Sequence, residues 1–147
     1  MAPKPSSQQG VVLLEALIGL LIFSLGVLAL VAMQAVSVSN VSKSRYRTEA
    51  AFLANEIIGE IWIDRGAGYA NVDKYAVTGG VGAGMPGADR WVEKVRSLLP
   101  GTDANPPEVA IVTPLAGGRQ VTVTLRWKAP DAVTPSNHVA VAFISEP

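Results

Sequence analysis

The sequence has no cysteine and only one histidine among its 147 residues. A domain without cysteine forms no disulfide, so outside the cytosol it would be held together by its core alone. The 12 basic and 12 acidic side chains cancel, which leaves no net field toward nucleic acid. We therefore expect no nucleic-acid partner. His138 has no cysteine or second histidine to share a metal ion with, so we expect no metal site and a surface position for this residue.

Charge is also almost missing from a long apolar run between Val11 and Val36. At ~1.5 Å per residue a helix over this run is about 39 Å long, whereas the hydrocarbon core of a bilayer is ~30 Å thick. The single ionisable residue in the run is Glu15. A carboxylate inside a membrane helix costs on the order of 2.5–3.5 kcal/mol, so its presence indicates a function.

The run is too long for a removable secretory signal, whose apolar part has ~7–15 residues. Its small residue, Gly10, also precedes the run instead of following it. We therefore expect a leader peptide over residues 1–10, followed by a membrane helix that is retained. A structural alternative for Glu15 is a carboxylate held at the membrane interface by the helix dipole.

The residues Gly10-Val11-Val12-Leu13-Leu14-Glu15 resemble the prepilin-type N-terminal cleavage/methylation signal. Type IV pilins and type II secretion pseudopilins carry this signal, with the consensus Gly-Phe-Thr-Leu-[Ile/Leu]-Glu. Here Val11 and Val12 replace the Phe and the Thr. The continuation Leu21–Leu28 and the pair Met33-Gln34 are closest to the PilV subgroup of minor pilins.

This resemblance implies that prepilin peptidase cleaves between Gly10 and Val11 and that Val11 is then N-methylated. It implies that Glu15 pairs with the terminal amine of a neighbouring subunit, which sets the register of a filament. The implied function is a minor type IV pilin, incorporated at or near the pilus tip to prime or support pilus assembly, with cell adhesion as a further role. The implied partners are the peptidase, the major pilin, other minor pilins, inner-membrane assembly proteins and membrane lipid.

The implied location is the bacterial inner membrane, with a single span and a periplasmic C-terminal head, and later the filament. Lys43, Arg45 and Arg47 follow the span, and by the positive-inside rule they mildly favour the opposite orientation. The cluster is interpreted as a solvated helix face, with contact to lipid phosphates as the alternative. Two other functions remain open: a minor pseudopilin of a type II secretion system, and a single-span anchored periplasmic protein without a filament role.

The rest of the sequence predicts an α+β fold of pilin type, in which the long N-terminal helix packs on a small antiparallel sheet. Its second half, 37–65, is amphipathic. The head, 66–147, is expected to begin with a glycine-rich loop over 66–88. Asp89 is expected to cap a helix over 90–99. Three strands are then predicted at about 108–113, 120–128 and 138–145, with a turn at Gly117-Gly118 between the first two.

The head contains few residues that suggest chemistry. Trp62, Trp91 and Trp127 are predicted to anchor the core. Gly82–Gly87 formally matches the GxGxxG pattern and supports a third alternative, a soluble nucleotide-binding enzyme. Pro86 lies inside the motif and no β-rich run precedes it, so a dinucleotide site is not expected. We expect no enzyme and no cofactor.

Overall fold

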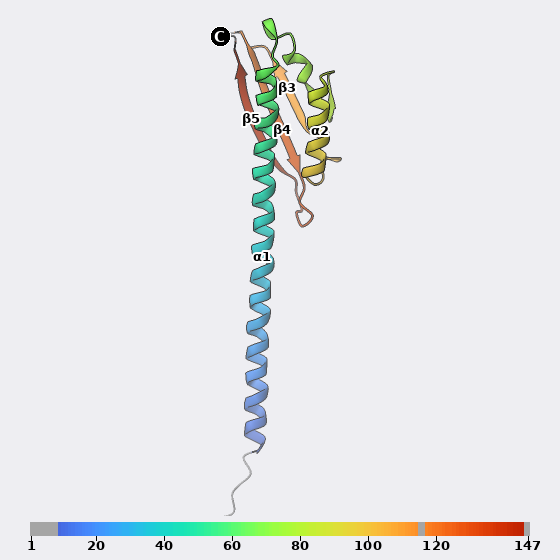
Figure 1. Cartoon of the computed structure of the whole chain (residues 1–147). Helices are drawn as coiled ribbons and strands as arrows, with labels where there is room; N and C mark the ends of the chain where they lie inside the picture. Colours follow the sequence, from blue (N-terminus) through green and yellow to red (C-terminus); the bar gives the residue numbers. More distant parts are fainter. Residues whose placement is uncertain (1–8, 115–116, 146–147) are drawn as a thin grey trace, which may run out of the picture. The chain divides into compact units, whose positions relative to one another are not determined.

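The computed structural model describes residues 9–114 and 117–145. The chain divides into two compact units, Met1–Val41 and Ser42–Pro147. In chain order the helices are α1 (Gln9–Ile63), the 3-10 helices η1 (Ala67–Tyr69) and η2 (Val72–Tyr75), and α2 (Pro86–Leu98). The strands are β1 (Val77–Thr78), β2 (Val81–Gly82), β3 (Glu108–Val112), β4 (Arg119–Trp127) and β5 (Ser136–Ile144). Figure 1 shows these elements.

The long helix α1 is continuous through both units. No glycine or proline interrupts the sequence from Val27 to Ile58, so no residue there favours leaving the helix. The helix ends at Ile63 because Gly66 adopts a φ of +68°, a conformation that cannot continue a right-handed helix. This end lies two residues before the predicted one, and the start at Gln9 lies two residues before Val11.

The five strands form one antiparallel sheet in the order β2-β1-β3-β4-β5. Side chains alternate between its two faces, and on β4 those of Val121, Val123, Leu125 and Trp127 are buried. Gly118, which precedes β4, has a φ of +78°, and a Cβ there would lie 2.8 Å from the carbonyl oxygen of Ile144. A side chain at this position would therefore push β5 away from the turn.

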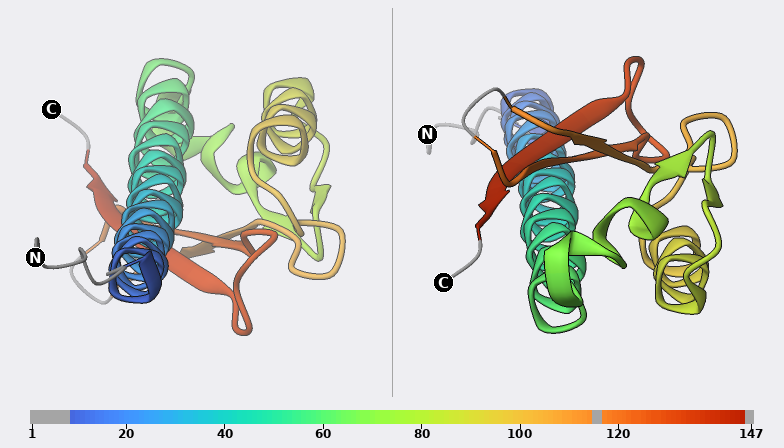
Figure 2. Two further views of the ribbon diagram at one scale, coloured as in Figure 1. Left: turned by 90° about the horizontal axis from the view of Figure 1, so that it is seen from below. Right: turned by 90° about the horizontal axis from the view of Figure 1, so that it is seen from above.

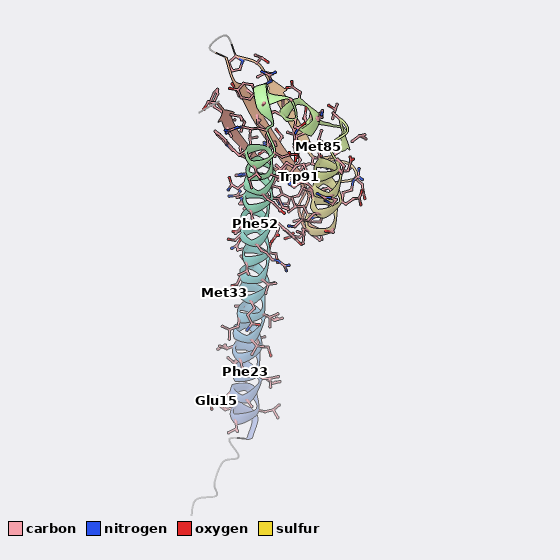
Figure 3. All side chains as sticks on the ribbon, turned by 45° about the horizontal axis from the view of Figure 1, so that its top comes forward. Glu15, Phe23, Met33, Phe52, Met85 and Trp91 are labelled. Carbon is pink, nitrogen blue, oxygen red and sulfur yellow. The ribbon has the colours of Figure 1, made fainter. Side chains whose placement is uncertain are left out.

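The core of the second unit lies between one face of this sheet and two helices. Residues 50–61 of α1 supply one side of the core and α2 supplies another, and both helices lie over the same sheet face (Figure 2). The indole nitrogen of Trp91 donates a hydrogen bond of 2.8 Å to the carbonyl oxygen of Leu53. Figure 3 shows Trp91 on the side of α2 that faces α1. The predicted α+β fold, with a long helix packed on a small antiparallel sheet, is confirmed.

The predicted loop over 66–88 was wrong, because this segment holds η1, η2 and the hairpin β1–β2. Three of its apolar residues, Val72, Tyr75 and Val77, are buried in the core. Glycines and a proline hide this pattern in the sequence, since they allow tight turns between very short elements. The sheet consequently has five strands, where the sequence predicted three.

The predicted cap of the second helix was also wrong. Helix α2 begins at Pro86, and its N-cap residue is Met85. Proline suits the first position of a helix, because its fixed φ is helical and its missing N–H would have no partner there. Asp89 lies in the first turn, where its carboxylate accepts a hydrogen bond of 3.2 Å from the backbone N–H of Gly82.

The three tryptophans do not share one role. Trp91 and Trp127 are buried as predicted, whereas Trp62 is 37% exposed and its ring lies under the Arg65 guanidinium at 5.6 Å. Trp62 follows Ile61, whose side chain fills the core position of that helical turn, so the indole points outward.

His138 was expected at the surface. In the structure it is half-buried on β5, opposite Leu125 of β4, so this expectation is met only in part.

Candidate functional site: the N-terminal end of α1

The first two turns of α1 hold Gly10, Val11 and Glu15, the residues of the predicted processing and register signal. Gly10 lies in the first turn of the helix, which begins at Gln9. Val11, Leu14, Glu15 and Ile18 line one shallow recess, so they share one face of the helix, as spacings of three and four residues require. Residues 1–8 of the expected leader lie outside the described residues. The structure thus brings Val11 and Glu15 to the same face, one turn apart.

Glu15 is exposed and projects sideways from α1 (Figure 3). Among residues 9–114 and 117–145, none forms a hydrogen bond or an ion pair with its carboxylate. Ser24 in the same unit differs from Glu15, because its hydroxyl donates a 2.7 Å hydrogen bond to the carbonyl oxygen of Leu20. Ser24 is satisfied by its own helix, while Glu15 needs water or another molecule.

The surface around Glu15 is apolar over a long distance. Every side chain from Val11 to Val38 is exposed, and no charged residue occurs from Ala16 to Ser42. This uncharged run of helix is about 40 Å long, close to the thickness of a bilayer with its headgroup regions. Among the described residues, α1 is the one helix long and apolar enough to cross a membrane. Glu15 at its end would then lie at the membrane interface, where a carboxylate remains hydrated.

A cut after Gly10 would change the electrostatics of this helix end. The new amine on Val11 would add a positive charge to the positive end of the helix dipole. Glu15 would lie on the same face, at a spacing whose Cβ atoms are ~5–6 Å apart. Cation and carboxylate would then form two exposed, complementary groups on one helix tip. Such a tip can pair with a second helix of the same kind that is displaced along its axis.

The second unit contains a different polar cluster, between α1 and α2. Lys94 donates hydrogen bonds of 2.7 and 2.9 Å to the two carboxylate oxygens of Glu56, and Arg90 lies 3.8 Å from Glu60. Glu60 also lies against the position where a Cβ on Gly87 would stand. These pairs link the two helices. Their cations and carboxylates neutralise each other, so they offer no net charge to a ligand.

The structure corrects the expected surroundings of the glycine motif Gly82–Gly87, but a dinucleotide site is still not expected there. A short strand, β2, ends on the first residue of the motif, Gly82, and helix α2 begins within the motif at Pro86. Its helix N-terminus, however, is approached by the carboxylates of Glu60 and Asp89. These negative groups stand where a phosphate would have to bind. Within the part of the chain that the structure describes, no three His, Asp or Glu side chains come together as metal ligands.

Tyr75 is a buried titratable group in the head. Its hydroxyl donates a 3.1 Å hydrogen bond to Asp64 Oδ2. Burial, together with this bond and the nearby negative charge of Glu60, raises the pKa of Tyr75 well above its usual value. Since a raised pKa keeps the hydroxyl protonated, Tyr75 acts as a hydrogen-bond donor that fixes the end of α1 to η2.

An ion pair that sequence reasoning missed joins η2 to β4. The Arg119 guanidinium donates hydrogen bonds of 3.0 and 3.2 Å to the two carboxylate oxygens of Asp73 and stacks on the Tyr69 ring at 5.2 Å. The Asp73 carboxylate raises the pKa of Arg119. The partners are 46 residues apart, so no local pattern could have paired them.

The basic cluster that follows the apolar run is exposed, as the predicted solvated helix face requires. Lys43, Arg45 and Arg47 are all exposed on α1. The Lys43 ammonium also lies 3.8 Å from the Asp131 carboxylate in a solvent-exposed ion pair.

Comparison with protein-family models, curated protein sequences and solved structures finds no match for this chain. The class of protein therefore follows from the architecture. A long apolar N-terminal helix whose second part packs on a small antiparallel sheet is a pilin-like architecture. Its apolar part is compatible with single-pass anchoring in a membrane.

Proposed function

We propose that this protein is a minor type IV pilin of the PilV kind. Prepilin peptidase cleaves it between Gly10 and Val11 and methylates the new amine. The subunit is held in the bacterial inner membrane by residues 11–36, with its head in the periplasm. It then enters a pilus at or near the tip, where it primes or supports assembly and presents a surface for adhesion.

The observation that carries this proposal is the position of Glu15. It stands exposed next to an uncharged run of α1, without a partner among the described residues, four positions after Val11 and on the same helix face. In a bundle of such helices an unpaired carboxylate would cost several kcal/mol. Pairing it with the amine of a neighbour removes that cost and fixes the axial register, as a single buried polar residue does in coiled coils.

The second unit supports the same function. Its core is complete, and in the described residues no buried side-chain polar atom lacks a hydrogen-bond partner. Such a head keeps its fold whether its helix lies in lipid or among other subunits. A filament subunit must make this transfer, so a self-sufficient head on an unpartnered helix suits the role.

The test is cell fractionation with and without prepilin peptidase. We expect the mature protein in sheared filaments from wild-type cells, and the longer precursor in membranes when the peptidase is deleted. Cleavage without any protein in filaments, combined with a loss of protein secretion on deletion of this gene, would identify a pseudopilin. An uncleaved protein in both strains would identify a single-span anchored protein.

A further inference from the structure

The two edges of the sheet differ in a way that the proposed function does not explain. One edge is β2, which has only two residues, Val81 and Gly82. The other edge is β5, which has nine residues and pairs with β4 along its whole length. Short edge strands discourage further pairing, whereas a long edge strand offers a row of backbone N–H and C=O groups to another chain. The edge at β2 is thus protected because it is short, whereas the long edge at β5 has no such protection.

The sequence of β5 carries none of the usual protections of an edge. From Ser136 to Ile144 it contains no lysine, no acidic residue, no proline and no glycine. The inner strands β3 and β4, which need no such protection, do carry charges at Glu108, Arg119 and Arg126. Natural sheets place charge or proline on exposed edges to prevent pairing. The distribution here is the reverse.

The outward face of β5 is apolar as well. Val139, Val141 and Phe143 are 49%, 53% and 63% exposed. They stand opposite Thr124, Thr122 and Gln120 of β4, so the apolar stripe lies at the edge and polar residues lie next to it. Cross-strand apolar pairs stabilise a sheet by roughly 0.2–1 kcal/mol each. A further strand beside β5 would complete three such pairs.

We propose that the outer edge of β5 is a docking site for an extended, uncharged strand of another protein. The strand adds to the sheet by backbone hydrogen bonds and places apolar side chains beside Val139, Val141 and Phe143. The backbone edge selects an extended segment over a helix, because only an extended segment can pair with every second residue. The absence of charge on β5 favours a partner strand without charge, because no side chain of β5 can form a cross-strand ion pair with it.

A synthetic peptide with the sequence of β5 itself serves as the probe. The pattern Val139-Ala140-Val141-Ala142-Phe143 has large residues at its ends and centre and alanine between them. An antiparallel copy centred on Val141 therefore sets large apolar residues beside large ones and alanine beside alanine. We would use this peptide with lysines added outside residues 136–145 for solubility, and with cysteine at the position that corresponds to Val141.

The experiment uses the full chain in lipid nanodiscs at one copy per disc. The sequence has no cysteine, so Val141→Cys and Thr122→Cys each introduce a single thiol. Thr122 is the control, because it lies on the same sheet face but on β4, where it is paired on both sides, with Ala110 of β3 and Val141 of β5. Paired residues on neighbouring strands have Cα atoms about 4.5–5.5 Å apart, a distance that a disulfide can bridge.

We expect the peptide to form a disulfide with the Val141→Cys chain at least ~10-fold faster than with the Thr122→Cys chain. A peptide with N-methylated amides along the pairing edge should lose this preference, because it lacks the backbone donors. Equal rates at the two positions, or no effect of N-methylation, would overturn the proposal.

Disulfide dimers of the Val141→Cys chain in discs with two copies and no peptide would assign the edge to a second copy instead. The readout does not depend on cleavage at Gly10, so its failure is distinct from failure of the pilin assignment.

Discussion

The two units of the chain differ in whether they bury their apolar side chains. In the second unit the side chains of Leu53, Trp91 and Trp127 are enclosed by two helices and a sheet. In the first unit every side chain from Val11 to Val38 is exposed. The second unit therefore contains the interactions that stabilise it, whereas the apolar side chains of the first unit have no such interactions within the described chain. Under the proposed function, this difference separates residues that determine folding from residues that determine assembly.

The largest effect is expected at the processing site. Gly10→Val places a branched side chain at the residue after which the peptidase would cut, so we expect complete loss of cleavage while the head folds normally. The measurement is the mass of the protein in membranes, which should remain that of the precursor. Gly19→Val is the control, because Gly19 lies in the same helix with open space around its Cβ position, and it should be cleaved. Normal processing of the Gly10→Val variant would refute the cleavage site.

The next effect concerns Glu15. Glu15→Gln removes the charge but keeps the shape, so cleavage should continue while the amount of protein in sheared filaments falls by ~10-fold or more, as expected when a buried ion pair loses one partner. Ser24→Ala is the control, since the Ser24 hydroxyl bonds only within its own helix. Filament levels of Glu15→Gln that equal those of Ser24→Ala would contradict the assembly role.

The third prediction addresses the head. Trp91→Ala should lower the free energy of unfolding by about 3–5 kcal/mol, because it opens a cavity and removes the indole hydrogen bond to the carbonyl oxygen of Leu53. Trp62→Ala should cost less than ~1 kcal/mol, because its ring is partly exposed. Denaturant unfolding of the full chain in detergent measures both. Similar losses for the two variants would contradict the described difference in burial.

The smallest effect concerns Tyr75 and depends on pH. Near neutral pH, Tyr75→Phe should cost about 1 kcal/mol, the typical value of one hydrogen bond. Above pH 10, the usual pKa of tyrosine, the unfolded chain loses its phenol proton while the folded chain keeps it. The free energy of unfolding of the native head then falls as pH rises. The Tyr75→Phe variant has no phenol proton at this position, so this loss does not occur in it. The stability difference between the two should therefore shrink above pH 10, and a constant difference would contradict the raised pKa.

The parts of the fold that sequence predicted well have regular apolar spacing. The clean alternation of β4 and the uninterrupted helix α1 were both visible, because their patterns extend over nine residues or more. The segment between α1 and α2 was missed, because β1 and β2 have two residues each and glycine dominates around them. A strand of two residues is too short to show the alternation of apolar and polar side chains. Asp89 was assigned as a cap because it preceded an apolar stripe, but Pro86 begins the helix one turn earlier.

The candidate site was visible in sequence because its signal is local. Gly10, Val11 and Glu15 lie within six residues, and the structure adds that Val11 and Glu15 share a face. The docking edge on β5 was not visible. Its alternation was clear in the sequence, but only the strand order shows that β5 lies at an edge with its large apolar residues turned outward. Long-range pairs such as Asp73 and Arg119 were missed for the same reason.

The most direct test of the central claim is mass spectrometry of the protein's N-terminus in sheared filaments. We expect a peptide that begins at Val11 and carries a methyl group on its amine. A protein that retains residues 1–10, or that occurs only in membranes and never in the filament fraction, would contradict the proposed function.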